Sequence, residues 1–250
     1  MKRIFGVFTV LLLFVSFAAF AGGKTEKGPA EPKVYPGNFV QIPGGTFQMG
    51  GEDAHVFGEE ERQIPWPEVT LDTFYMAVRP ITQGEFESVM GTNPSLGKNP
   101  DWAVELVSWF QAVEYCNRLS QRDGLSPVYT INGENVTMNR SANGYPLPTE
   151  AEWEYACLAP NVQWTSTAHP WGLKGMPSEN YEWCWDRYDG AYPSGKFVNP
   201  TGSDTGAHRI LRAGPLFGCE SRGVVARTRA HDAPANGTTA FGFRVVRSSI

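Results

Sequence analysis

Three hydroxyl side chains, each followed three residues later by Glu or Gln, constrain the fold of this chain more than any other feature. The pairs are Thr82 with Glu85, Ser108 with Gln111, and Thr149 with Glu152. In such a pair the hydroxyl accepts a hydrogen bond from a free backbone N–H, and the longer side chain reaches back to the first N–H. The pattern predicts three helices, and we expect short strands and irregular segments elsewhere.

Apolar side chains recur at helical spacing after two of these starts. They are Trp109, Val113, Cys116 and Leu119 in the second segment, and Trp153, Tyr155, Ala156 and Cys157 in the third. Such stripes are typical of a core rather than of a cofactor site. Cys116 and Cys157 are therefore expected to be buried small hydrophobes. The four cysteines lack C-x-x-C or Cys/His zinc spacing, and whether Cys184 pairs with Cys219 depends on their distance.

The strand signals are short. Residues 39–50 alternate around a Pro-Gly-Gly turn, which predicts a hairpin, and residues 69–78 form another candidate strand that ends at Pro80. Near the C-terminus, Ile210–Leu211 and Phe243–Val246 read as strands on either side of a polar, turn-rich loop over 215–239. Long irregular segments in a compact domain are normally functional or held by specific packing. We expect function to be displayed on this loop.

The first residues predict export. Met1–Arg3 is positive, Ile4–Phe20 is apolar, and Ala19–Ala21 fits an A-x-A cleavage site, so residues 1–21 read as a signal peptide. A membrane anchor is the alternative, although the run is only marginally long for a bilayer. Residues 22–36 have the composition of a flexible linker, and 37–250 suffice for one domain. We expect a periplasmic, outer membrane-associated or cell-surface protein with no transmembrane segment after signal removal.

The net charge of −5, with scattered Lys and Arg, lacks the electrostatic footprint of a nucleic-acid binder. We therefore expect no nucleic-acid partner. A monomer is the default for the oligomeric state.

Seven segments together resemble the formylglycine-generating enzyme (sulfatase-modifying factor) family in the family's order. They are Ile42–Gly50, Val104–Trp109, Leu147–Ala156, His169–Gly172, Glu182–Trp183 with Asp186 and Tyr188, Arg209–Gly214, and Gly242–Val246. The resemblance implies an α+β, C-type lectin-like fold with small twisted antiparallel sheets, few helices and much irregular structure.

The family's chemistry needs a pair of cysteines close together, because one thiolate must bind copper or attack while the second completes the ligand set. The matching segment of this chain, 215–222, holds only Cys219. The resemblance therefore implies a non-enzymatic member with no cofactor, and a surviving copper-dependent oxidoreductase is the alternative. The family's calcium pattern is also altered, and Glu182 reads either as a remaining calcium ligand or as a capping or surface carboxylate.

The C-terminal stretch is similar to the variable region of proteins diversified by diversity-generating retroelements. In that class, mutagenesis of Asn-type codons scatters certain residue types over a fixed scaffold and does not yield Lys, Met or Trp. Residues 215–241 contain none of these three, although Glu220 does not fit. The resemblance implies a variable ligand-binding region at about 209–247.

Arg222, Arg227, Arg229 and Pro234 are expected to be fixed, and Arg227 and Arg229 are expected to hold the loop by hydrogen bonds to carbonyl groups. The expected ligand-binding positions lie between these fixed residues. They are Leu216, Phe217, Gly218, Ser221, Gly223, Val224, Ala230, His231, Asp232, Ala235, Asn236, Thr238, Thr239 and Phe241. Leu216 and Phe241 either contribute to an apolar centre or pack into the core. His231 beside Asp232 reads either as an acid–base pair or, without a convincing nucleophile, as a surface hydrogen bond.

These observations predict a non-catalytic, exported protein that binds a macromolecular ligand, most simply another protein, through its C-terminal loop. An accessory protein that holds a complex together without any variable site is a further alternative.

Overall fold

The computed structural model describes residues 34–35, 38–51, 66–160, 162, 168–176, 180–190, 192–213 and 226–248. The predicted signal peptide lies outside these ranges, as does the predicted linker up to residue 33. Val34–Tyr35, inside the stretch expected to be a linker, form strand β1 and pair with strand β2, Phe39–Ile42. No helix in the described ranges has the length and apolar character that crossing a bilayer requires.

The three predicted helices are confirmed, each with its capping pair. Helix α1 is Gln83–Met90, α2 is Trp109–Arg122 and α3 is Glu150–Leu158. At the start of α3, the Glu152 N–H donates to Thr149 Oγ1 at 3.1 Å, and the Thr149 N–H donates to Glu152 Oε2 at 2.8 Å. The apolar stripes of α2 and α3 are buried, and Cys116 and Cys157 are fully buried within them. Local capping chemistry therefore sets where the helices begin.

The predicted hairpin over residues 39–50 is wrong in its pairing. Its two strands exist as β2 and β3 (Gly45–Gln48), but they belong to different sheets. The strand predicted over 69–78 is divided into β4 (Glu68–Leu71) and β5 (Phe74–Ala77). Strand β2 pairs with β5, and β3 pairs with β4, both antiparallel. The two segments thus form one bent ladder that passes from one sheet into the next.

The bend depends on a close approach of main chains at Gly44. A Cβ atom there would lie 2.7 Å from the Leu71 carbonyl oxygen and 2.8 Å from the Thr73 nitrogen. The Gly44 N–H also donates to Thr73 Oγ1 at 3.1 Å. Because the glycine is held against the neighbouring strand, residues 43–44 carry the chain forward into the next sheet and do not reverse it.

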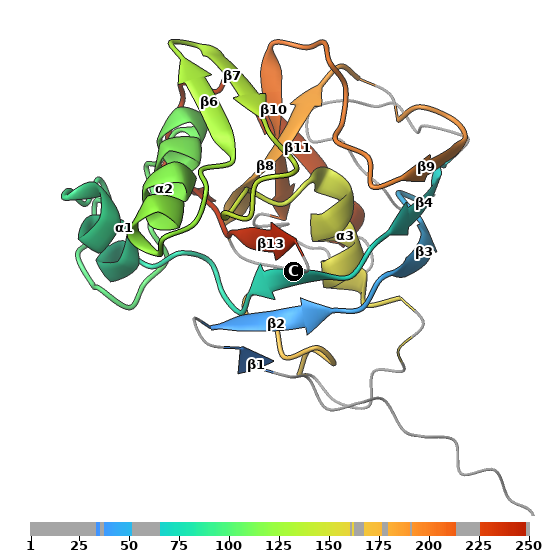
Figure 1. Ribbon diagram of the computed structural model, residues 1–250, viewed down its shortest axis with the longest axis horizontal. Coiled ribbons are helices and arrows are strands. Elements are labelled where there is room, and N and C mark those ends of the chain that lie inside the picture. The colour runs from blue at the N-terminus through green and yellow to red at the C-terminus, as the bar shows by residue number, and fades with distance from the viewer. Residues whose placement is uncertain are drawn as a thin grey trace, which may run out of the picture. The chain divides into compact units, whose positions relative to one another are not determined.

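The described strands form four small sheets, arranged with α2 and the β6–β7 hairpin on one side and β3, β4 and β9 on the other (Figure 1). The strand orders are β1-β2-β5-β13, β11-β10-β8-β12, β3-β4-β9 and β6-β7. The remaining strands are β6 Tyr129–Asn132, β7 Asn135–Met138, β8 Tyr181–Tyr188, β9 Lys196–Val198, β10 His208–Ala213, β11 Arg229–Asp232, β12 Phe241–Gly242 and β13 Val246–Ser248. The α+β class is confirmed, and two of the four sheets are antiparallel as predicted, but the other two are mixed, since β12–β8 and β4–β9 are parallel.

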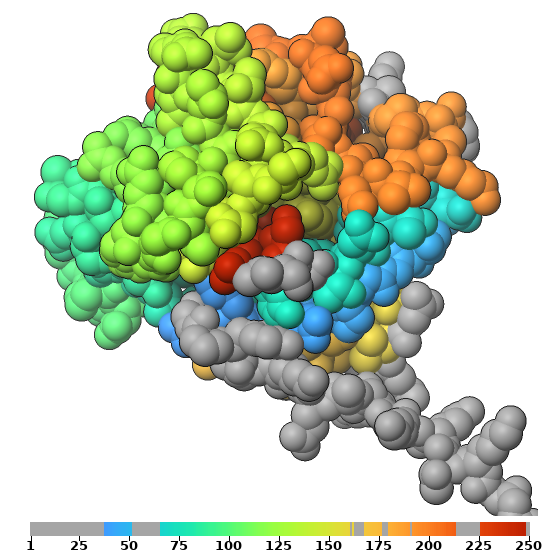
Figure 2. Space-filling view, in the orientation of Figure 1, coloured from blue at the N-terminus to red at the C-terminus, as the bar shows by residue number. Residues whose placement is uncertain are grey.

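The strand predicted over 243–246 is also corrected. Strand β12 ends before it and β13 begins at Val246, because β12 pairs with β8 in one sheet and β13 pairs with β5 in another. Residues 243–245 cross between the two sheets and are almost fully buried. Only a small patch in the C-terminal colour of β13 reaches the surface in the view of Figure 2. Residues 243–245 thus join the two sheets within the core.

Replacing Gly44 with Ala tests the close approach at the bend. The added methyl group meets main-chain atoms that cannot turn away, so we expect a loss of about 1–3 kcal/mol in the free energy of unfolding. Gly97→Ala is a matched control, because its nearest neighbour is the ring of Trp102, whose exposed fraction is 57%. We expect that variant to change stability by less than about 0.5 kcal/mol in urea denaturation. Equal effects of the two substitutions would contradict the assignment.

Candidate ligand-binding site

The structure describes eight of the predicted ligand-binding positions, and they follow one another from β11 to β12. Ala230, His231 and Asp232 lie in β11, Phe241 begins β12, and Ala235, Asn236, Thr238 and Thr239 lie in residues 233–240, here called the crossing segment. The other predicted positions, together with Cys219, lie outside the described residues: Leu216, Phe217, Gly218, Ser221, Gly223 and Val224.

The crossing segment is held by main-chain hydrogen bonds. The Leu106 N–H donates to the Thr238 carbonyl at 2.8 Å, and the Tyr181 N–H donates to the Ala240 carbonyl at 2.7 Å. Between these anchors, a Cβ on Gly237 would lie 2.7 Å from the Leu106 carbonyl oxygen, so the two main chains touch there. These contacts fix the segment to the rest of the domain through its main chain, and the Ala240 N–H also donates to Thr238 Oγ1 at 3.2 Å.

Exposure divides the described positions. Ala235, Asn236, Thr238 and Thr239 are exposed. Ala230 and Phe241 are both 92% buried, and Phe241 packs edge-on against Trp183 with ring centroids 5.2 Å apart. Phe241 is thus in the core, which was the alternative left open by its place next to the final strand. The accessible part of the described site is the crossing segment.

His231 and Asp232, which are half-buried, serve different contacts. Asp232 Oδ1 accepts from the Ala233 N–H at 2.7 Å and from Asn236 Nδ2 at 2.8 Å, which closes the turn at the start of the crossing segment. His231 Nδ1 lies 2.8 Å from His208 Nδ1. Asp232 therefore helps to fix the turn, and His231 forms a pair with His208.

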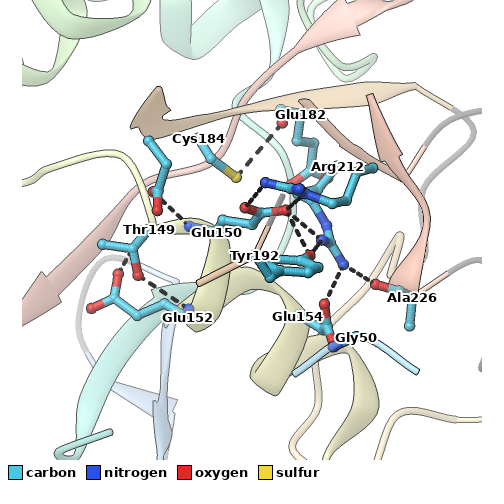
Figure 3. Close-up of polar contacts among 12 residues, drawn as sticks. Gly50, Thr149, Glu150, Glu152, Glu154, Glu182, Cys184, Tyr192, Arg212 and Ala226 are labelled. Atoms are coloured by element: carbon cyan, nitrogen blue, oxygen red, sulfur yellow. Dashed lines mark hydrogen bonds and ion pairs between the residues drawn. The ribbon is translucent and has the colours of Figure 1, made fainter. Parts of the chain in front are cut away.

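Helix α3 is joined to β10 by a network of buried charges (Figure 3). Arg212 donates to Glu150 Oε1 at 2.7 Å and to Glu154 Oε2 at 2.8 Å, and all three side chains are at least 96% buried. The same guanidinium donates to the Ala226 carbonyl, at the start of the chain leading into β11. Glu150 also accepts from Tyr192 Oη at 3.0 Å.

Arg229 extends this network into the predicted binding region. Its Nε donates to Glu150 Oε1 at 2.7 Å, its Nη2 to Glu150 Oε2 at 2.9 Å, and its Nη1 to the Gly190 carbonyl at 2.9 Å. The bond to Gly190 confirms that Arg229 contacts a carbonyl, but its main partner is a carboxylate. The guanidinium also lies 4.0 Å from the centroid of the Tyr192 ring. Arg229 therefore holds β11 to helix α3.

The two carboxylates of the network differ in pKa. Burial raises the pKa of Glu150, but the charges of Arg229 and Arg212 outweigh it, so the net shift is downward. Burial also raises the pKa of Glu154, and the opposing effects of Arg212 and the Gly50 N–H do not cancel it. Glu150, which faces two arginines, is thus the carboxylate held most firmly as an anion.

Glu182 belongs to a second buried ion pair and is not a surface or capping carboxylate. Arg244 donates to its two oxygens at 2.5 and 2.7 Å, and Trp153 Nε1 donates to Oε2 at 2.8 Å. Both oxygens are therefore committed to protein donors. This arrangement gives Glu182 a structural part in joining α3, β8 and the crossing between β12 and β13.

Sequence reasoning missed Glu150, Glu154, Arg212 and Arg244 as determinants of the site. One signal was present in the sequence, because Glu150 and Glu154 are one helical turn apart and flank the buried Trp153. Carboxylates on the apolar face of a helix require cationic partners, since an unpaired buried charge is costly.

Asp186, in β8, is a buried carboxyl group at the start of α3. Its Oδ2 accepts from the Glu150 N–H at 2.8 Å. Burial, followed by the charge of Glu150, raises the pKa of Asp186 from 3.8 to about 7. Asp186 thus changes charge in the neutral pH range.

The described cysteines are unsuited to thiolate chemistry. Cys116, Cys157 and Cys184 are fully buried free thiols, and burial raises the pKa of each, to about 12 for Cys157. Since the thiolate is the nucleophile and the metal ligand, these three residues do not replace the missing partner of Cys219.

The described part of the chain also contains a small cleft, separate from the candidate ligand-binding positions. It has a volume of about 110 Å³ and is lined by side chains that include Phe39, Arg79, Tyr115, Asp123 and Tyr145. None of the eight described ligand-binding positions lines it.

Comparison with known proteins defines the class. The model of the sulfatase-modifying factor enzyme 1-like domain matches residues 25–169, more than half of the chain, and the chain belongs to this family. The resemblance seen in the sequence motifs is thereby confirmed.

Individual relatives refine this placement. Chaperone protein LppX of Paenibacillus barcinonensis is 37% identical over 199 residues, which cover 70% of this chain and 67% of that protein. The formylglycine-generating enzyme of Bos taurus is 26% identical over 74% of this chain, and the match spans 54% of the enzyme's own length. The solved structure of Treponema denticola variable protein 1 superimposes with a TM-score of 0.68 at 25% identity, covering 84% of this chain and 95% of that one.

Replacing Arg229 with Met tests the hold of the network on β11. Breaking a buried pair by removing one partner typically costs about 3–5 kcal/mol, because a charge is left unpaired. We expect a loss of that size in urea denaturation. Arg118→Met is the matched control, since the Arg118–Glu114 pair on α2 is half-exposed, and it should cost no more than about 0.5 kcal/mol. Similar losses in both variants would argue against the network.

The raised pKa of Asp186 predicts a pH-dependent contribution to stability. Because its folded-state pKa is above its unfolded value, the native state holds an extra proton between about pH 4 and pH 7, so stability from this group is lost as the pH rises through that window. Asp186→Asn removes this loss. As the pH rises from 4 to 8, the free energy of unfolding of the variant should therefore increase relative to that of wild type by up to about 4 kcal/mol.

The control for this measurement is Asp204→Asn, at an exposed position. Its unfolding free energy should follow that of wild type across the same pH series. Parallel profiles for Asp186→Asn and wild type would show that Asp186 does not carry the effect.

Proposed function

We propose that this chain is a non-catalytic, exported protein that binds another protein through a changeable site, formed by residues 216–224 together with the crossing segment. The observation that carries the proposal is that main-chain hydrogen bonds hold the crossing segment while its side chains are exposed. Main-chain atoms of Thr238 and Ala240 anchor it to Leu106 and Tyr181, while the side chains of Ala235, Asn236, Thr238 and Thr239 are exposed. The contacts of the Asn236 and Thr238 side chains are local, with Asp232 and with the Ala240 N–H.

This arrangement has a physical advantage for binding. A segment already fixed by its main chain loses little conformational entropy when a ligand binds, so affinity depends on the side chains that it presents. Exposed side chains contribute little to folding, and their replacement usually changes stability by less than about 0.5 kcal/mol. Different side chains can therefore be presented without a change of scaffold.

The nature of the partner is inferred from two relatives. The relative from Paenibacillus barcinonensis is named a chaperone, and the structural relative from Treponema denticola is named a variable protein. The first name fits a protein that binds other proteins, and the second fits a site whose residues change. Ala230 and Phe241 are buried and contribute no contact surface. The exposed positions 235, 236, 238 and 239 supply small and polar side chains, and the half-buried His231 and Asp232 lie at one end of them.

Sequences of this protein from many isolates test the proposal. We expect amino-acid differences to concentrate at positions 216–224 and at 235, 236, 238 and 239, and to be rare at the anchoring residues Glu150, Arg212 and Arg229. Differences spread evenly over exposed positions of the chain would overturn it.

A displayed library provides a laboratory version of the same test. Positions 235, 236, 238 and 239 are randomised, and the library is panned against a panel of purified proteins. We expect folded binders whose unfolding free energies stay within about 1 kcal/mol of wild type. The matched control randomises Thr130, Asn132, Glu134 and Asn135, which are exposed on the β6–β7 hairpin. Equal enrichment from both libraries would count against a dedicated site.

A copper-dependent oxidoreductase is the second candidate, favoured by relatives named formylglycine-generating enzymes. It conflicts with the single cysteine of segment 215–222 and with the buried, protonated state of the described thiols. Incubation of the purified protein with copper and a sulfatase-motif peptide separates the two. The binding function predicts no aldehyde, and formation of aldehyde would establish the enzyme.

A further inference from the structure

Two histidines at the edge of the candidate site direct the same ring nitrogen at one point. His208 Nδ1 and His231 Nδ1 are 2.8 Å apart, and the ring centroids are 5.0 Å apart. Both side chains are half-buried, so solvent reaches the pair. An imidazole nitrogen that carries no hydrogen is a good ligand for a divalent transition metal.

The fold holds both rings in place. His231 faces Ile210 across the β10–β11 ladder, and His208 is two residues from Ile210 on the same strand, so both histidines project from the same side of the sheet. The Tyr188 ring stacks on His231, with centroids 3.7 Å apart and an interplanar angle of 13°. The pair is therefore arranged by three neighbouring strands, β8, β10 and β11.

We propose that His208 and His231 form a binding site for a divalent transition-metal ion such as Zn²⁺ or Cu²⁺. Metal–nitrogen bonds of about 2.0–2.1 Å, at the angles found in square-planar or tetrahedral complexes, place two ligand nitrogens about 2.9–3.4 Å apart. The observed 2.8 Å needs to widen by only a few tenths of an ångström. The ion would lie beside the line that joins the two nitrogens, at the apex of the nitrogen–metal–nitrogen angle, so both rings must also turn to direct their Nδ1 lone pairs at it.

Binding requires a change of tautomer but no net release of protons from a neutral pair. One Nδ1 now donates to the other, and the donor ring must move its hydrogen to Nε2 so that both Nδ1 lone pairs face the ion. Within the described part of the chain, no group of three or more His, Cys, Asp or Glu side chains converges on one point. The two histidines thus supply two ligands, and water or a group on a bound partner completes the coordination.

This inference does not depend on the proposed binding function, because the metal alone is the probe. Purified full-length protein is titrated with Zn²⁺ while long-range ¹H–¹⁵N correlation spectra of the imidazole rings are recorded. We expect the Nδ1 resonances of His208 and His231 to shift together and to saturate at one equivalent. Unchanged Nδ1 resonances in the presence of excess Zn²⁺ would overturn the proposal and leave a simple hydrogen bond between the rings.

Substitutions supply the second arm. His208→Gln and His231→Gln should each weaken Zn²⁺ binding by about tenfold or more, since even the loss of an outer partner of a metal-bound histidine costs that much. His55→Ala removes another histidine of the chain and is the matched control, which should keep the wild-type affinity. Equal weakening by His55→Ala would overturn the assignment. If a Gln variant fails to fold, as judged by circular dichroism, the wild-type spectra decide alone.

Discussion

The carboxylate of Glu150 is the point on which the rest of the structure depends. It stands at the first turn of α3 and receives hydrogen bonds from Arg212 of β10 and Arg229 of β11, so one side chain joins a helix to two strands. Buried charges of this kind tolerate little displacement, because each partner needs the others to offset its loss of water. The network thereby fixes α3 against the sheet that carries β10 and β11.

Such a network also fits the changeable site proposed for this chain. Apolar contacts are non-directional and permit several packings of similar energy, whereas bidentate arginine–carboxylate pairs have strict geometry. The second pair, Arg244 with Glu182, fixes the chain where it crosses from one sheet to another. Buried charges thus hold the candidate region at both ends, through Arg229 and Arg244.

Local signals in the sequence predicted local structure well and pairing poorly. The capping pairs located all three helices, since that chemistry involves residues only three positions apart. The hairpin was wrong because strand pairing depends on contacts distant in sequence, here the close approach of Gly44 to Leu71 and Thr73. The exposed part of the crossing segment was anticipated from composition, but its anchors, Leu106 and Tyr181, were not, because nothing nearby in the sequence marks them.

The path of the crossing segment limits how this region can evolve. Strands β11 and β12 are at opposite edges of the sheet β11-β10-β8-β12, three strand spacings or about 14 Å apart. They also differ in position along the sheet: β11 ends level with the C-terminal end of β8, whereas β12 begins beside the N-terminal end of β8. The segment must therefore bridge the sheet diagonally while keeping Thr238 and Ala240 in register with their partners. Exchange of one exposed side chain for another leaves this span intact, whereas a deletion or insertion shifts the register, so the sheet constrains the length of this segment more tightly than the identity of its exposed residues.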